Sequence, residues 1–229
     1  MSAQRVRVWF RKGERLRYIS HLDVLRFWER AIRRAELPLS YSQGFTPHPR
    51  LAFASPLPLG FIGEAEIMDV TLDERVALAS FRERVAAQAS DDLCLVAVAE
   101  VPTGAPAPQS CLSWADFRVD VPGLDPEEAG QAVAEFLALE AMEWVDDRRE
   151  KARTIDLRDG VSQLAAEPLD GGTRLTMRLR AHQDLTVRPE LVVAALFSGR
   201  EPGMIARVAL YLDEPSPARD AWRRRGRFE

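Results

Sequence analysis

The chain has 229 residues, of which 46% are hydrophobic and 29% are charged, and its formal net charge is −4. This composition is typical of a folded protein with a sizeable core and excludes a disordered or fibrous chain. The charge is uneven: residues 1–52 hold 11 Arg and Lys against 4 Asp and Glu, a net of +7, so the rest carries −11. Such a localised basic segment favours contact with a polyanion.

Cysteine use and hydropathy bound the compartment. Cys94 and Cys111 lack the spacing of a metal site, and nothing suggests a disulfide, which favours a reducing environment. No apolar run approaches the roughly 20 residues that span a bilayer, and the first residues do not form a secretory signal. We therefore expect a cytoplasmic protein without membrane contact. No zinc spacing, Gly-rich phosphate loop or nucleophile elbow is present, so no metal or cofactor site is predicted in this chain.

Residues 1–101 are predicted to form a first domain. Its first strand, 5–12, alternates as a half-buried strand does, with apolar Val6, Val8 and Phe10 opposite Arg5, Arg7, Trp9 and Arg11. The elements that follow are a helix over 20–36, strands over 50–54 and 64–72, a helix over 74–89 and a strand over 93–101. This βαββαβ order is that of a ferredoxin-like domain.

A Pro-rich linker over 102–111 is predicted to separate a second domain, 112–213. Its predicted elements are a strand over 116–121, a helix over 125–140 capped by Asp125, a strand over 142–146, a strand and short helix over 154–164, a hairpin of 163–168 with 173–181, a helix over 188–197 and a strand over 204–212. We therefore expect an α+β protein of tandem ferredoxin-like domains, the second with an insertion, whose antiparallel sheets carry helices on one face. Residues 214–229 form a basic tail with interleaved aromatic residues.

The helix over 20–36 combines a capped start with a basic face. Ser20 is predicted to be its N-cap, with Asp23 completing a capping box. The face opposite the apolar stripe carries Arg26, Arg30, Arg33 and Arg34 with few carboxylates. Solvated charged helix faces are common, but this excess of arginine favours a polyanion-binding patch.

The loop after this helix carries an unusual mixture of side chains. Gly44 permits a left-handed backbone, and Pro47 and Pro49 stiffen the chain around His48. Flat rings and donors on a rigid backbone suit single-stranded RNA. The predicted binding residues of the loop are Tyr41, Ser42, Gln43, Gly44, Phe45, Pro47, His48 and Arg50.

Two histidines are candidates for acid–base chemistry. His21 lies at the start of the helix, where it could transfer protons or simply pack, and His48 lies beside Arg50, which favours ligand contact. Asp69, Asp116 and Asp156 show no pairing that would indicate a carboxylate dyad. No catalytic pair is complete, so a non-catalytic role is favoured.

The motif Ser20-His21-Leu22-Asp23, followed by Arg26, by residues 30–35 and by the Tyr41–Arg50 loop, resembles the radical-SAM-linked (radical-SAM-associated) bacterial protein family, a domain of unassigned function. The resemblance extends over residues 5–212 and is strongest over 9–66, and Asp156-Leu157-Arg158 fits a weaker family element. It implies a partner role beside a radical SAM protein, which would carry an iron–sulfur cluster and S-adenosylmethionine. This chain itself lacks a CxxxCxxC motif.

Three functional hypotheses follow. The favoured one is an accessory module that recognises RNA, such as tRNA or rRNA, for a radical SAM enzyme. One alternative is a metal-independent RNA-processing or RNA-modifying enzyme that uses His48 or His21, with Arg50 stabilising phosphate charge. The other is a protein that docks the radical SAM partner without contacting RNA. The RNA hypothesis predicts that the helix arginines and His48 share one concave, positively charged surface.

Overall fold

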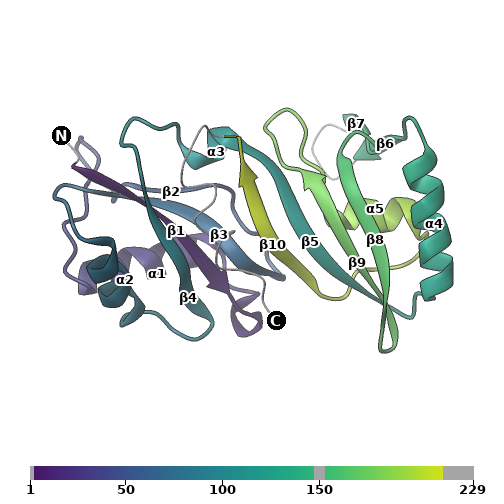
Figure 1. The fold of residues 1–229 in the computed structure, drawn as a ribbon, viewed down its shortest axis with the longest axis horizontal. Coiled ribbons are helices and arrows are strands. Elements are labelled where there is room, and N and C mark those ends of the chain that lie inside the picture. Colours follow the sequence, from purple (N-terminus) through teal and green to yellow (C-terminus); the bar gives the residue numbers. More distant parts are fainter. Residues whose placement is uncertain (1–2, 147–152, 214–229) are drawn as a thin grey trace. The chain divides into compact units, whose positions relative to one another are not determined.

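The computed structural model describes residues 3–146 and 153–213 (Figure 1). The fold is mixed α+β, and antiparallel strand pairing predominates, which confirms the predicted class. The described chain divides into two compact units, residues 3–112 with 212–213, and residues 113–211. The charged loop at 147–152 and the basic tail at 214–229 lie outside the described residues.

The first unit alternates strands and helices. Its elements are β1 (Gln4–Lys12), the short 3-10 turn η1 (Glu14–Leu16), α1 (His21–Arg34), β2 (Leu51–Phe53), β3 (Phe61–Leu72), α2 (Leu78–Ala86), β4 (Leu93–Val101) and α3 (Pro108–Cys111). The sheet has the order β4-β1-β3-β2, and each pair of neighbours is antiparallel. The first four strands of the chain therefore lie in the spatial order 4-1-3-2.

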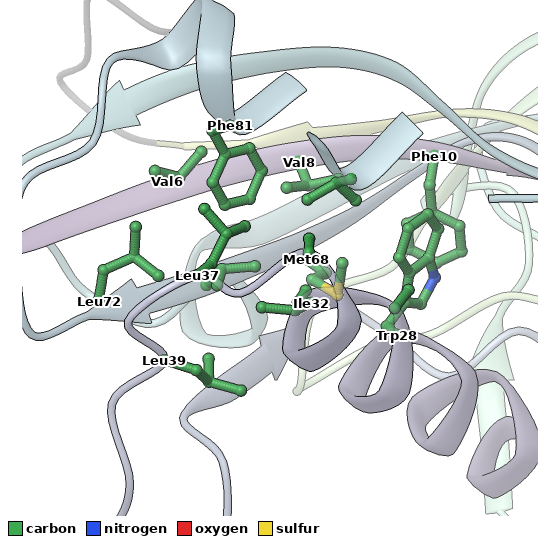
Figure 2. Close-up of a cluster of buried hydrophobic side chains, with 14 of the residues drawn as sticks. Val6, Val8, Phe10, Trp28, Ile32, Leu37, Leu39, Met68, Leu72 and Phe81 are labelled. Atoms are coloured by element: carbon green, nitrogen blue, oxygen red, sulfur yellow. The ribbon is translucent and has the colours of Figure 1, made fainter. Parts of the chain in front are cut away.

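One face of this sheet carries the core of the unit (Figure 2). Val6 lies opposite Val70 and Val8 opposite Met68, so the two central strands present their apolar side chains to α1 and α2 together. Trp28 of α1 is fully buried against Phe10, with ring centroids 5.3 Å apart. Truncation of such a side chain costs about 3–5 kcal/mol, so this contact fixes α1 on the sheet.

The other face of the same sheet buries charge, contrary to the half-buried interpretation of β1. Register places Arg7 opposite Asp69, and both Arg5 and Arg7 bind its carboxylate, with Nε to oxygen distances of 2.8 and 2.7 Å. Arg5 also donates to the carbonyl oxygens of Ala105 and Pro106, at 2.5 and 2.8 Å. These hydrogen bonds attach the predicted linker segment to this face. Arg5 and Arg7 therefore make internal contacts and do not contribute to an exposed basic surface.

The second unit repeats the same strand order. Its elements are β5 (Leu112–Pro122), α4 (Pro126–Ala138), β6 (Glu143–Asp146), β7 (Arg153–Asp156), β8 (Val161–Leu169), β9 (Gly172–Arg180), α5 (Pro189–Leu196) and β10 (Ile205–Leu212). The sheet order is β10-β5-β9-β8, and β6 with β7 forms a separate two-stranded sheet. When that small sheet is set aside as an insertion, the order is again 4-1-3-2.

Register explains the two faces of the second sheet. Phe117 lies opposite Met177 and Val119 opposite Leu175, and these side chains are buried on one face. The alternate positions are polar, and there Asp116 lies opposite Arg178. Figure 1 shows α4 and α5 in the same unit, and α4 packs on β8 and β9.

The predicted short helix within 154–164 is wrong. The chain turns after β7 because the carboxylate of Asp156 accepts hydrogen bonds from the amides of Met142 and Arg158, at 3.0 and 2.9 Å. These hydrogen bonds hold the pKa of Asp156 below its ordinary value, the bond from Met142 being the largest cause. Leu157 is fully buried, so the Asp156-Leu157-Arg158 element has a structural explanation as a turn.

Candidate nucleic-acid interface

The start of α1 is a closed capping box, as predicted. The Asp23 amide donates to Ser20 Oγ at 3.2 Å, and the Ser20 amide donates to Asp23 Oδ2 at 3.3 Å. The Ser20 hydroxyl also donates to Asp23 Oδ2 at 2.7 Å, and it is the main reason that the pKa of Asp23 lies below its ordinary value. Ser20 and Asp23 therefore fix where the helix begins.

His21 packs into the interior side of the same motif. Its ring meets Phe53 edge-on, with centroids 4.9 Å apart, and it lines a cavity of about 10 Å³ with Lys12 and Glu66. The buried Lys12 Nζ donates to the carbonyl oxygens of Arg17 and Ile19, at 3.0 and 3.2 Å. Burial lowers the pKa of Lys12, and the charge of Glu66 opposes that change. A cavity this small has no room for a ligand. The hydrogen bonds of Lys12 instead fix the segment that leads into α1.

The predicted basic face of α1 lies at the surface. Arg26, Arg30, Arg33 and Arg34 are all exposed. Arg26 is 3.8 Å from Asp23, whereas Arg30, Arg33 and Arg34 have no ion-pair partner among the described residues. Their charge is therefore available to a ligand, although their binding role stays a prediction.

The helix ends earlier than predicted. Ala35 is the C-cap, and Glu36 adopts a left-handed backbone with φ of 52°, two residues before Pro38. The carbonyl oxygen of Glu36 accepts a hydrogen bond from Arg84 of α2, which holds this turn. Arg33 and Arg34 consequently lie in the last turn, where positive charge is favourable to the helix dipole.

The Tyr41–Arg50 loop is a hairpin-like projection. Ser42 and His48 close it, because the Ser42 amide donates to the His48 carbonyl at 2.8 Å and the His48 amide donates to Ser42 Oγ at 2.9 Å. Gly44 has φ of 137°, which favours glycine, and Phe45 is fully exposed. The loop therefore presents an aromatic ring at its tip on a hydrogen-bonded base.

Two hollows adjoin the base of this loop. The first, of about 500 Å³, is lined by Ser40, Tyr41, Ser42, Gln43, Gly44, Pro47, Arg50 and Asp73. The second, of about 370 Å³, is lined by Arg5, Arg50, Leu51, Ala52, Asp69, Thr71, Thr103 and Ala107. Arg50 lines both. We call them the loop hollow and the strand hollow.

The structure brings together only part of the predicted set, and the two hollows are not the one concave surface that the RNA hypothesis predicts for the helix arginines and His48. Six predicted loop residues line the loop hollow, but none of the α1 arginines, His21 or His48 lines either hollow. His21 packs against Phe53 at the start of α1, whereas the His48 backbone is held in the Tyr41–Arg50 loop by Ser42. This arrangement gives no support to the two histidines as an acid–base pair.

Sequence reasoning missed Thr71, Asp73 and Thr103, which line these hollows beside Arg50. Thr71 and Arg50 are linked by a backbone hydrogen bond of 3.1 Å, and Ser40 Oγ donates to Asp73 Oδ1 at 2.6 Å. No local sequence signal marks these positions, because they are distant from Arg50 in the sequence and line the hollows only in the folded chain.

Comparison with solved structures finds distant similarities. A chain of a Cbf5-Nop10-Gar1 complex matches with a TM-score of 0.51 and 10% identity over 91% of this chain and 50% of that one. An H/ACA RNP bound to a substrate RNA containing 2'-deoxyuridine gives 0.47 with 11% identity, over 91% of this chain and 49% of that one. The chain thus spans about half the length of these structures, and the first similarity concerns the fold alone.

Comparison with family models assigns the chain to a family, whereas comparison with curated proteins finds no relative. No curated protein matches the chain. A family model described as "Uncharacterized protein conserved in bacteria (DUF2344)" matches residues 5–189, which is most of its length. The chain therefore belongs to this family of uncharacterised conserved bacterial proteins.

Proposed function

We propose that this chain is a non-catalytic RNA-binding module that acts beside a radical SAM enzyme. The observation that carries the proposal is the run of exposed arginines without an ion-pair partner in the described chain: Arg30, Arg33, Arg34 and Arg50. A protein surface normally intersperses both signs of charge, whereas here Arg30, Arg33 and Arg34 lie close together along one helix. Phosphates would supply the missing negative charge.

The loop favours single-stranded RNA over a duplex. Phe45 at the loop tip and Tyr41 at its base are exposed, and such rings stack on bases that have left a helix. The arginines contribute affinity without sequence preference, and the loop contributes contacts to bases. We also assign both units, with their 4-1-3-2 strand order, to the ferredoxin-like arrangement.

The radical SAM partner is the second part of the proposal. It is supported by the resemblance of residues 20–23 and 41–50 to radical-SAM-linked proteins. The partner would supply the iron–sulfur cluster and S-adenosylmethionine, and this chain would bind the tRNA or rRNA to be modified in the cytoplasm.

RNA binding is tested by fluorescence anisotropy with labelled tRNA and rRNA fragments across a salt series. The double variant Arg33→Gln/Arg34→Gln is compared with Arg75→Gln/Arg200→Gln, which removes the same charge from exposed positions elsewhere. We expect the first variant to lower affinity about 10-fold or more and the salt slope by about two, since each phosphate contact contributes about one. Absence of binding, or equal losses in both variants, would refute the proposal.

A docking role without RNA contact is the alternative that one observation favours. Tyr18, Leu22 and Leu59 are large apolar side chains that are 60–71% exposed, and the Gly60 amide binds the Arg17 carbonyl at 2.9 Å beside them. Co-purification of the radical SAM protein would distinguish the two roles. If Leu22→Ser abolishes co-purification and the wild-type protein binds no RNA, docking is the function.

A further inference from the structure

We propose that Arg50 is the shared phosphate contact of two adjacent nucleotide sites, one in the loop hollow and one in the strand hollow. The inference rests on the proposed RNA-binding function and deepens it, because it names the ligand as two consecutive nucleotides of single-stranded RNA. The loop hollow would hold a base that carries an exocyclic amino group, and the strand hollow would hold a ribose.

The position of Arg50 is fixed on both sides by backbone pairing. Its amide donates to the Ser40 carbonyl at 2.8 Å, and its carbonyl accepts from the Thr71 amide at 3.1 Å. The exposed side chain lines both hollows and has no ion-pair partner among the residues that the structure describes. A guanidinium on a shared wall can bind the phosphate that joins two nucleotides, while its rigid backbone limits the entropy lost on binding.

The loop hollow has the surfaces that a base requires. The Tyr41 ring is 37% exposed and Pro47 lies on the same lining, so a flat base has a face against which to stack. Asp73 Oδ1 accepts from Ser40 Oγ, which orients the carboxylate and leaves its second oxygen without a hydrogen bond in the described chain. A carboxylate accepts from the amino group of cytosine but is repelled by the carbonyl oxygen at the same place in uracil. We therefore infer a preference for cytosine over uracil.

The strand hollow has the groups that a ribose requires. Thr71 and Thr103 line it, and within residues 3–146 and 153–213 neither hydroxyl has a hydrogen-bond partner. Its apolar lining comes from Leu51, Ala52 and Ala107, and Arg5 with Asp69 adds a closed, buried ion pair. Free hydroxyls can both donate to and accept from a 2′-hydroxyl, which is the group that distinguishes RNA from DNA.

The experiment measures anisotropy of fluorescein-labelled octamers, C8 RNA, U8 RNA and C8 DNA, at one low salt concentration. For the wild type we expect C8 RNA to bind about 10-fold more tightly than U8 RNA, within the range of one base-specific hydrogen-bonded contact. Arg50→Gln should weaken C8 RNA at least 10-fold and lower the salt slope by about one. Asp73→Asn should abolish the preference for C8 over U8, and Thr71→Val/Thr103→Val should abolish the preference for RNA over DNA.

Two controls separate this inference from the general one. Arg33→Gln removes an exposed charge from α1 and should weaken C8 and U8 RNA equally. Asn at position 73 retains an acceptor for the Ser40 hydroxyl, and thermal unfolding checks that each variant folds. The two-site inference is overturned, and the proposed function stands, if tRNA binds and two further results are obtained. These are that Arg50→Gln weakens binding no more than Arg33→Gln does, and that the wild type binds C8 and U8 RNA with equal affinity. If no RNA binds, both are overturned.

Discussion

Two arginine-rich regions of this chain use the same side chain in opposite ways. On β9 of the second unit, Arg174 donates two hydrogen bonds to the Asp120 carboxylate, at 2.7 and 3.0 Å. Arg178 donates two to the Asp116 carboxylate, at 2.7 and 2.8 Å. On α1 of the first unit, Arg30, Arg33 and Arg34 have no such partner in the described chain. A count of arginines therefore does not measure the charge that a surface offers.

The difference arises from geometry. An antiparallel pair sets one residue directly across from another, and β5 places Asp116 and Asp120 opposite Arg178 and Arg174. A helix face offers neighbours only three or four residues away, and α1 supplies few carboxylates there. Arg5 and Arg7 belong with the paired group, since both bind Asp69. Arg5 and Arg7 therefore do not add to the exposed charge of residues 1–52, whereas the arginines of α1 and Arg50 of its loop do.

The largest loss of stability is expected from breaking the buried ion pairs of Asp69 with Arg5 and Arg7. Asp69→Asn removes a carboxylate that both Arg5 and Arg7 bind, all three side chains being at least nine-tenths buried. Uncompensated buried charge costs about 3–5 kcal/mol, so urea unfolding should show a loss of that size. The exposed Arg33→Gln should change stability by no more than about 0.5 kcal/mol. Similar losses in both variants would contradict the division into paired and free arginines.

Sequence reasoning succeeded where the cause is local. Ser20 and Asp125 were predicted as caps, and each accepts the expected amide hydrogen bonds, because a cap depends on residues two or three positions away. The alternation of Val6, Val8 and Phe10 predicted one buried face of β1 for the same reason. Local pattern therefore accounts for most elements and for the class of the fold.

It failed where the cause is a register between distant strands. Arg7 and Asp69 are 62 residues apart, and only the pairing of β1 with β3 sets them face to face. The place of Thr71 beside Arg50 depends on the same kind of pairing and could not be predicted. Gln43 and Arg50 were identified as loop residues from their chemistry, but their shared hollow required the fold.

A smaller loss of stability is expected from the half-buried pair on β9. Asp116→Asn weakens the two hydrogen bonds from Arg178 and the one from the Tyr211 hydroxyl, which is 2.6 Å long. Hydrogen bonds to charged groups contribute about 1.5–3 kcal/mol, so a loss in that range is expected by urea unfolding. Tyr211→Phe, which keeps the ring over Arg178, should cost less. A larger loss from Tyr211→Phe would show that the ring hydroxyl, and not the ion pair, holds this face.

An effect on binding alone is expected at the loop tip. Phe45 is fully exposed, so Phe45→Ala should leave the free energy of unfolding unchanged. If its ring stacks on a base, the substitution should cost about 1–3 kcal/mol of binding free energy to single-stranded RNA. Leu59→Ala, another exposed apolar truncation, provides the control in the same anisotropy measurement. Equal losses from both truncations would remove the loop tip from the interface.

The smallest effect is expected in acid, at the cap that begins the basic helix. The folded pKa of Asp23 lies below its ordinary value of 3.8, chiefly because the Ser20 hydroxyl donates to its carboxylate. The unfolded chain therefore binds the proton first as the pH falls, so the contribution of Asp23 to stability is present above pH 3.8 and is lost as the pH falls through the lowered pKa.

Asp23→Asn should accordingly reduce the loss of unfolding free energy between pH 5 and pH 3, as measured by urea titrations at each pH. Asp91→Asn is the matched control, because Asp91 is exposed and its carboxylate has no hydrogen bond in the described chain. If the pH dependence is unchanged in Asp23→Asn, the charge of Asp23 contributes nothing measurable to the free energy of unfolding, and the cap only fixes where α1 begins. The charges of Arg26 and Arg30, which also lower the pKa of Asp23, would then have no measurable part in stabilising the start of the helix.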